Sequence, residues 1–156
     1  MTRRNFLKMM LASAATVLAG APMRLAHAAD RVEKISLPEA EWRKRLTPNQ
    51  FNILREEGTE RPFTSPLNSE KRTGSFACVA CGLHLFSSAA KYDSGTGWPS
   101  FFDHIPGSLE TKTDYKLLLP RTEYHCARCG GHHGHVFNDG PEPTGLRYCN
   151  NGVALT

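Results

Sequence analysis

Residues 78–81 read Cys78-Val-Ala-Cys81, and residues 126–129 read Cys126-Ala-Arg-Cys129. Two residues between two cysteines let one tight turn present both sulfurs to a tetrahedral ion, and a second such turn completes a four-cysteine zinc site. Glycine follows each pair directly, which suits the tight backbone of such a knuckle. The 44 residues between the pairs must then fold back so that the knuckles meet, and we expect one structural Zn²⁺ per chain.

Two other roles stay open for these four cysteines. An exported chain can pair them as two disulfides. A redox-active C-x-x-C of the thioredoxin type is the other alternative, but it needs a βαβ context that this sequence lacks. Zinc is favoured by the matched spacing of the two pairs, and it would contribute folding free energy directly.

The rest of the chain from residue 61 onward consists of short β-like runs separated by Gly, Pro, Asn and Asp. Strands are expected at residues 76–81, 83–86, 115–119, 122–126, 135–137 and 146–149, with turns at 139–140 and 143–145. Strands and helices do not alternate, which argues against a parallel sheet. The sequence therefore predicts a mainly β fold of two antiparallel sheets, with short N-terminal helices packed against them.

Residues 29–60 form a helical lead-in to this β domain, which covers residues 61–156. A first short helix is expected to start near Pro38 and to run through Leu46. A second helix has clearer boundaries, because Thr47, Pro48 and Gln50 form a capping box with proline in the first turn, and Gly58 marks its end. We expect residues 29–156 to form one folded unit.

Residues 1–28 have the layout of an export signal. A basic cluster (Arg3, Arg4, Lys8) precedes a mildly apolar run over residues 9–21, which is shorter than the roughly 20 residues that span a bilayer. Ala26-His27-Ala28 is a small-x-small cleavage site, and residues 2–8 resemble the twin-arginine export motif. We therefore expect a periplasmic protein. A general-secretion signal and a permanent anchor are the alternatives.

The charge of the chain belongs largely to this signal. The whole sequence has 19 basic and 15 acidic residues, but four basic residues and no acidic ones lie in residues 1–28. Removing these four leaves 15 basic and 15 acidic residues in the mature chain. A nucleic-acid binder needs a basic excess on its folded domain, so we expect no nucleic-acid partner, and we expect a monomer.

Cys149 is the cysteine left over when the two pairs are set aside. Arg147 lies two residues before it, and three histidines lie at positions 132, 133 and 135. Cationic neighbours favour the nucleophilic thiolate, so we expect a lowered pKa. Alternation along a strand would place Arg147, Cys149 and Asn151 on one face, and a regular strand would put His133 and His135 together. The alternative is that Cys149 is a small buried hydrophobe.

Four separated motifs resemble one family, the B-type methionine sulfoxide reductases. Residues 132–151 read H-x-G-H-V-F-x-D-G-P-x-P-T-G-x-R-Y-C-x-N, and residues 91–101 read K-Y-D-S-G-x-G-W-P-S-F. The two C-x-x-C pairs complete the pattern. The resemblance runs from about Pro38 to the C-terminus, nearly all of the mature chain, and it implies thiol-dependent reduction of the R epimer of methionine sulfoxide to methionine.

The resemblance also implies residue roles. Cys149 is similar to the nucleophile, which becomes a sulfenic acid. His135 and His132 match the acid and polarising positions, with Asp139 as a partner behind them. Asn151 and Arg147 match polar residues beside the reacting centre. Trp98 matches the indole that packs on the ε-methyl group of the substrate, and Phe137 belongs to the same binding wall.

The chain departs from the family pattern at Thr96, where many members carry a resolving cysteine. Once zinc holds four cysteines, Cys149 has no partner for an intramolecular disulfide. We expect a one-cysteine cycle in which an external thiol reduces the sulfenic acid. That thiol would be a thioredoxin-like periplasmic relay or a low-molecular-weight thiol. The expected substrates are oxidised exported proteins that carry methionine-R-sulfoxide.

Two further functions remain as alternatives to the reductase. One is an exported zinc-knuckle binding module with an inert, buried Cys149. The other is a zinc hydrolase that uses the histidine cluster of residues 132–135, which requires a second metal ion and activity without the Cys149 thiol.

Overall fold

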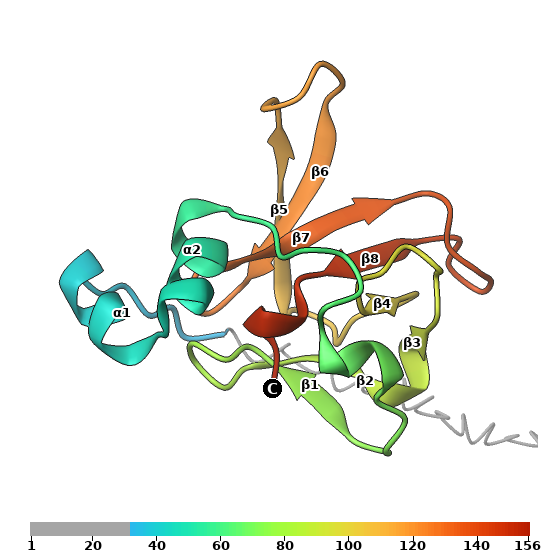
Figure 1. Ribbon diagram of the computed structural model, residues 1–156, viewed down its shortest axis with the longest axis horizontal. Helices are drawn as coiled ribbons and strands as arrows, with labels where there is room; N and C mark the ends of the chain where they lie inside the picture. Colours follow the sequence, from blue (N-terminus) through green and yellow to red (C-terminus); the bar gives the residue numbers. More distant parts are fainter. Residues whose placement is uncertain (1–31) are drawn as a thin grey trace, which may run out of the picture.

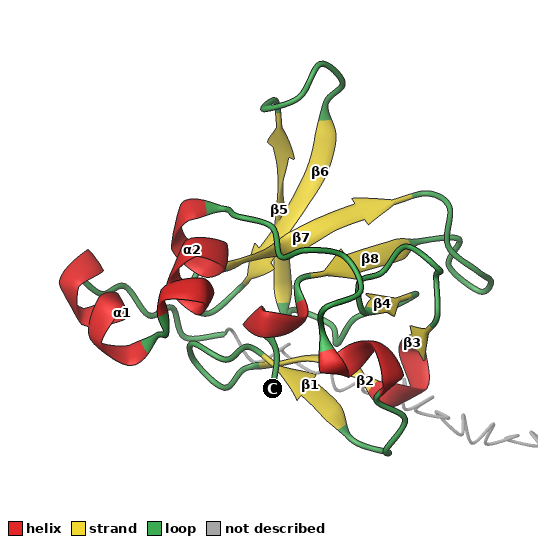
Figure 2. Ribbon diagram, in the orientation of Figure 1, coloured by secondary structure: helices red, strands yellow, loops and turns green. Residues whose placement is uncertain are grey.

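The computed structural model describes residues 32–156, so the expected export signal at 1–28 lies outside the described residues. Over the described range the fold is mainly β, with two antiparallel sheets and two helices, as the sequence predicts (Figures 1 and 2). One sheet pairs β1 with β2, and the other has the order β3-β4-β8-β7-β6-β5. None of the helices within residues 32–156 has the length and apolar character needed to cross a membrane.

The helices are α1 (Glu39–Arg45) and α2 (Pro48–Glu56), with single 3-10 turns η1 (Pro66–Ser69), η2 (Ser88–Ala90) and η3 (Gly152–Ala154). The strands are β1 (Ser75–Ala77), β2 (His84–Ser87), β3 (Lys91–Tyr92), β4 (Ser100–Phe101), β5 (Leu109–Asp114), β6 (Arg121–Cys126), β7 (His132–Phe137) and β8 (Arg147–Asn150).

The start of α2 confirms the expected capping box. Thr47 Oγ1 accepts a hydrogen bond from the Gln50 backbone N–H, and Gln50 Oε1 accepts one from the Thr47 N–H. The helix ends one residue earlier than the glycine signal indicates, because Glu57 itself takes the left-handed conformation (φ 54°). The helix pair buries Trp42, Phe51 and Leu54 in the core.

The core lies between the sheets and is rich in aromatic rings. Phe86 of β2 and Phe101 of β4 stack with their centroids 4.2 Å apart, and Tyr124 of β6 meets Tyr148 of β8 edge to face at 5.5 Å. Phe86, Phe101 and Tyr124 have no exposed surface. These rings fix β4, β6 and β8 against the small sheet, and thereby fix the position of Cys149 on β8.

The expected strand at residues 115–119 is wrong. This apolar run is the loop that joins β5 to β6, and the real strand before it, β5, has the polar sequence LETKTD. The β5–β6 hairpin projects away from the body of the protein, so no core face is available to bury the run (Figure 1). Strand β1 also ends at Ala77, because the first cysteine knuckle begins at the next residue.

Strands β7 and β8 approach each other closely where Gly134 faces β8. A Cβ atom added to Gly134 would lie only 1.9 Å from the carbonyl oxygen of Cys149, which is backbone and cannot move aside cheaply. Glycine at this position therefore permits the pairing that holds Cys149.

We predict that Gly134→Ala destabilises the protein by about 2 kcal/mol or more, since overpacking against backbone forces the strands apart. The free energy of unfolding, measured by urea titration, checks this. Gly74→Ala is the matched control, because a Cβ there meets no atom within 4 Å. Equal unfolding midpoints for the two variants would contradict the close approach.

Candidate active site and metal centre

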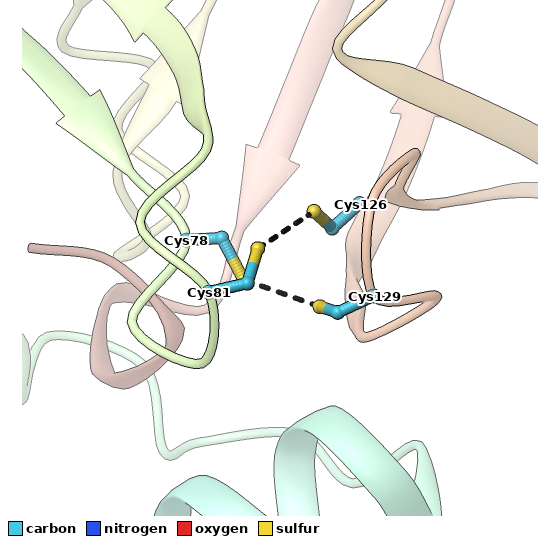
Figure 3. A group of neighbouring side chains, drawn as sticks. All are labelled: Cys78, Cys81, Cys126 and Cys129. Carbon is cyan, nitrogen blue, oxygen red and sulfur yellow. Dashed lines mark hydrogen bonds between the residues drawn. The ribbon is translucent and has the colours of Figure 1, made fainter. Parts of the chain in front are cut away.

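The four paired cysteines form one cluster, as the spacing predicts (Figure 3). Cys78 and Cys81 lie in the turn between β1 and β2, whereas Cys126 ends β6 and Cys129 lies in the next turn. Their sulfurs all lie within 4.8 Å of one another, with Sγ–Sγ distances of 3.6 Å for Cys78–Cys129 and 3.5 Å for Cys81–Cys126. The glycines after the knuckles adopt positive φ values of 72° and 66°, the backbone form that the tight turns need.

These distances distinguish zinc from disulfides. A disulfide needs its sulfurs about 2.05 Å apart. Four sulfurs at about 2.3 Å from a tetrahedral zinc ion lie about 3.8 Å from each other, close to the observed spacing. The donor set thus fits a structural Zn²⁺ ion held by Cys78, Cys81, Cys126 and Cys129.

We predict one zinc ion per chain by metal analysis, and a large drop in melting temperature when a chelator removes it under reducing conditions. The metal links the small sheet to the β6–β7 turn, so its binding energy is folding energy. Cys78→Ser should lose both the metal and the stability, whereas Cys149→Ser should keep both. A metal-free, oxidised protein of equal stability would instead favour disulfides.

The unpaired Cys149 lies at the centre of the large sheet. Its β-strand neighbours are Ser100 of β4 on one side and His135 of β7 on the other. It borders a small pocket of about 140 Å³, whose lining residues are Thr59, Trp98, Arg121, Gly134, His135, Phe137, Cys149, Asn150 and Asn151. The pocket is large enough for one side chain and too small for a peptide.

The apolar part of the pocket comes from two rings that the sequence predicts as substrate-binding. Trp98 precedes β4, and its indole N–H donates a hydrogen bond of 3.1 Å to the backbone carbonyl of Glu60. Phe137 ends β7, and the guanidinium carbon of Arg147 lies 4.3 Å from the centre of its ring. Both rings are therefore held in place by polar groups outside the pocket.

The histidines are arranged by an irregularity in β7. Glu123 pairs with His135 and Tyr124 with Gly134, but the next residue, His125, pairs with His132. The extra residue on β7 is His133. The regular strand that would place His133 and His135 on one face is therefore not present, and it is His132 that contacts His135, with ring centroids 5.5 Å apart.

Carboxylates lie behind both of these histidines. His132 Nδ1 is 2.9 Å from Oε1 of Glu123, although the contact is too bent for a well-aligned hydrogen bond. Burial lowers the pKa of His132, and the Glu123 carboxylate opposes this shift only in part. His132 is thus a neutral imidazole at neutral pH.

His135 is held by Asp114, the last residue of β5. His135 Nε2 lies 2.8 Å from Asp114 Oδ2, and the same oxygen accepts a 2.6 Å hydrogen bond from Arg121. The Lys116 backbone N–H, His135 and Arg121 together hold the pKa of Asp114 well below its usual range. His135 therefore faces a permanently charged carboxylate.

Asp139, which the sequence places behind the histidines, has a different partner. It accepts two hydrogen bonds from Arg147, at 2.8 and 2.9 Å, because both residues lie at the end of the β7–β8 pair. The carboxylates behind the histidines come instead from Asp114 and Glu123 on the neighbouring hairpin. No motif in the sequence singles out these two residues. They come close to the histidines only through the pairing of the strands in the large sheet.

The pKa of the Cys149 thiol is raised, in contrast to the lowered value that the sequence predicts. Burial is the main cause, and it outweighs the opposing effects of the Arg147 charge and the Thr96 hydroxyl. Cys149 is therefore a protonated thiol when the pocket is empty.

The side chains of Asn151 and Asn150, which both line the pocket, form hydrogen bonds to the groups around it. The Asn151 side chain donates to the His133 carbonyl and accepts from the Glu60 backbone N–H, both at 2.9 Å. Asn150 is fully buried, and its Oδ1 accepts a 2.9 Å hydrogen bond from the Tyr124 hydroxyl. These hydrogen bonds fix the backbone of the two residues that follow Cys149.

His133 is completely buried, and neither ring nitrogen has a well-aligned hydrogen-bond partner within residues 32–156. Desolvation lowers its pKa to about 3. The unfolded chain binds a proton near pH ~6.5 and the native state does not, so this residue removes stability as the pH falls.

Because of His133, the free energy of unfolding of the wild type should fall by about 2 kcal/mol between about pH 7 and pH 5. We predict that this contribution is absent in His133→Leu. Leucine has similar bulk and binds no proton. Urea unfolding of zinc-loaded protein at both pH values measures the effect, and His84→Leu, at an exposed histidine, is the control. Parallel pH dependence in wild type and His133→Leu would disprove it.

Cys149 thus shares one pocket with an imidazole and two aromatic rings, and comparison with known proteins gives the class of protein to which such a site belongs. A SelR domain covers residues 46–156. The chain is 52% identical over 123 residues to the peptide methionine sulfoxide reductase MsrB of Agrobacterium fabrum, covering 78% of this chain and 91% of that protein.

Two further relatives carry the same name. The Methanosarcina barkeri protein is 53% identical over 118 residues, which are 75% of this chain and 83% of that protein. The Pseudomonas putida protein is 52% identical over 125 residues, or 80% of this chain and 94% of that protein. This chain therefore belongs to the SelR family of MsrB-type peptide methionine sulfoxide reductases, and it is an oxidoreductase.

Proposed function

We propose that the chain reduces methionine-R-sulfoxide, mainly within proteins, to methionine, and that Cys149 is the nucleophile. The observation that carries this proposal is the pocket itself: it joins the Cys149 thiol, the Trp98 and Phe137 rings and the His135 imidazole in a space for one side chain. In this proposal the rings pack on the methyl end of the substrate, and the polar side receives the sulfoxide oxygen.

The proposed reaction moves one oxygen atom. The Cys149 sulfur attacks the substrate sulfur, and the sulfur–oxygen bond of the substrate breaks. The protonated oxygen becomes bonded to the Cys149 sulfur as the transient sulfur–sulfur bond breaks, which leaves methionine and a cysteine sulfenic acid. The thiol proton passes through His135 to that oxygen, because an unprotonated oxide is a poor leaving group. The Asp114 carboxylate stabilises the imidazolium that forms in transit, while His132 polarises the oxygen and Arg147 and Asn151 orient the thiol and the pocket wall. Asp139 supports Arg147.

The sulfenic acid is then reduced by two external thiols, giving water, the Cys149 thiol and a disulfide of the reductant. Thr96 supports this one-cysteine cycle, since it stands where many family members carry a resolving cysteine. The other four cysteines support it too, because a zinc ion would occupy them all. The reductant in this proposal is a thioredoxin-like relay of the periplasm or a low-molecular-weight thiol.

The proposed setting is the periplasm, where the β catalytic domain of residues 61–156 would repair oxidised exported proteins. Support comes from the twin-arginine-type sequence at residues 2–8 and the small-x-small site at residues 26–28. A twin-arginine route would also let the protein fold around zinc before it leaves the cytoplasm.

We predict that the mature, reduced, zinc-loaded protein makes one methionine per chain in a single turnover without reductant, from the R epimer only. A racemic methionine sulfoxide peptide, chiral product analysis and intact mass measure this. The mass should rise by one oxygen at Cys149, and Cys149→Ser should make no methionine. The intact mass of Thr96→Cys should instead fall by two hydrogens after the turnover, because its new thiol condenses with the sulfenic acid to form a disulfide.

Three outcomes would overturn the proposal or part of it. Loss of two hydrogens by the wild type would make a knuckle cysteine the resolving thiol. No methionine and an unchanged Cys149 would favour the zinc-knuckle binding module. Activity that survives Cys149→Ser together with a second bound metal would favour a hydrolase.

A further inference from the structure

The β5–β6 hairpin carries an apolar tip that no part of the described chain covers. Of the five large hydrophobic side chains that are exposed within residues 32–156, four lie in its loop: Tyr115, Leu117, Leu118 and Leu119. Leu118 is 99% exposed and Leu119 is 75% exposed. Leaving this much apolar surface in water at one point of a protein marks an interaction site.

The tip is attached directly to the active site. Asp114 closes the strand below it by accepting a 2.8 Å hydrogen bond from the Lys116 N–H, and its other oxygen contacts His135 and Arg121. Arg121 begins the returning strand and also lines the Cys149 pocket. One carboxylate therefore fixes both the base of the apolar loop and a histidine of the pocket.

The charges of the hairpin are already engaged inside the protein. Lys112 and Lys116 both bind the Glu57 carboxylate, each at 2.5 Å, and Arg121 binds Asp114. The two lysine pairs hold the hairpin against the end of α2, whereas the Arg121–Asp114 pair lies within the hairpin. They also leave the tip with apolar surface and no unpaired cation within the described residues of the hairpin, which suits an apolar polypeptide better than an anionic lipid headgroup.

The size of the pocket requires that most of a protein substrate lies outside it. The pocket holds about one side chain, so the neighbouring residues of the substrate must cross the adjoining surface. Arg121 lines the pocket and lies only two residues after Leu119, and an extended chain advances about 3.3 Å per residue, so residues two to four positions from the sulfoxide can reach this end of the loop. Methionine is mostly a core residue, and its neighbours in an unfolded protein include other apolar side chains.

We propose that the tip formed by Tyr115, Leu117, Leu118 and Leu119 binds apolar side chains that flank methionine sulfoxide in unfolded polypeptide substrates. This inference rests on the proposed function and adds a substrate class to it: non-native protein segments with apolar residues near the oxidised methionine. Free methionine sulfoxide has no flanking residues and would gain nothing from the tip.

The test compares wild type, the pair Leu118→Ser with Leu119→Ser, and the conservative pair Leu118→Ile with Leu119→Ile. The substrates are N-acetyl-methionine-R-sulfoxide amide and two methionine-R-sulfoxide peptides, one with leucine and one with serine two to four residues from the sulfoxide. The serine pair should lower kcat/KM on the leucine peptide about five- to twentyfold, since two partly desolvated leucines are lost. Its kcat/KM on the amide and the serine peptide should not change, and the isoleucine pair should match wild type throughout.

Failure of this inference is distinct from failure of the proposed function. A wild type that reduces no substrate would refute the function. A wild type that reduces all three substrates, with the serine pair equally active on each, would refute the substrate-binding tip alone. Two other results would also overturn it: a wild-type dimer that the serine pair dissociates in sedimentation, or vesicle binding that the serine pair loses without any change in peptide kinetics.

Discussion

The meeting of the two cysteine knuckles is the constraint on which the rest of the structure depends. It joins the β1–β2 turn to the turn between β6 and β7 at sulfur separations of 3.5 and 3.6 Å. His132 begins β7 only three residues after Cys129, so the cluster fixes where that strand starts. Strand β7 in turn pairs with β8 and sets His135 opposite Cys149. The four-cysteine cluster thus determines the geometry of the Cys149 pocket.

Much of this could be predicted from the sequence, because it is local or repeats in pairs. The capping box of α2, the two knuckles and the turns around residues 139–145 each depend on neighbouring residues. The strand β5 could not be predicted, since LETKTD has no apolar face and becomes a strand only through pairing with β6. The apolar run after it imitates a strand, yet its side chains lie beyond the sheet and in water.

The candidate site also has parts that could be predicted from the sequence and parts that could not. Cys149, Trp98, Phe137 and the two histidines come from contiguous motifs, whereas Asp114 and Glu123 reach the histidines only across the sheet. A single extra residue at His133 decides which histidine joins His135, and the sequence alone does not locate such a bulge. The error for Asp139 has the same origin, because proximity in sequence to His135 suggests a contact that the strand register gives to Arg147.

The raised pKa of Cys149 is consistent with the proposed chemistry once the proton is followed. A thiolate formed in advance would attack the sulfoxide without supplying the proton that its oxygen needs. In the proposed reaction, the half-buried thiol keeps that proton until the substrate is in place, and His135, held against a charged Asp114, lies on the adjacent strand to carry it. The protonated resting form is also a weaker nucleophile toward other oxidants. In the proposed reaction, partial burial would therefore suppress reaction outside the pocket, and substrate binding would supply the acceptor that makes proton release favourable.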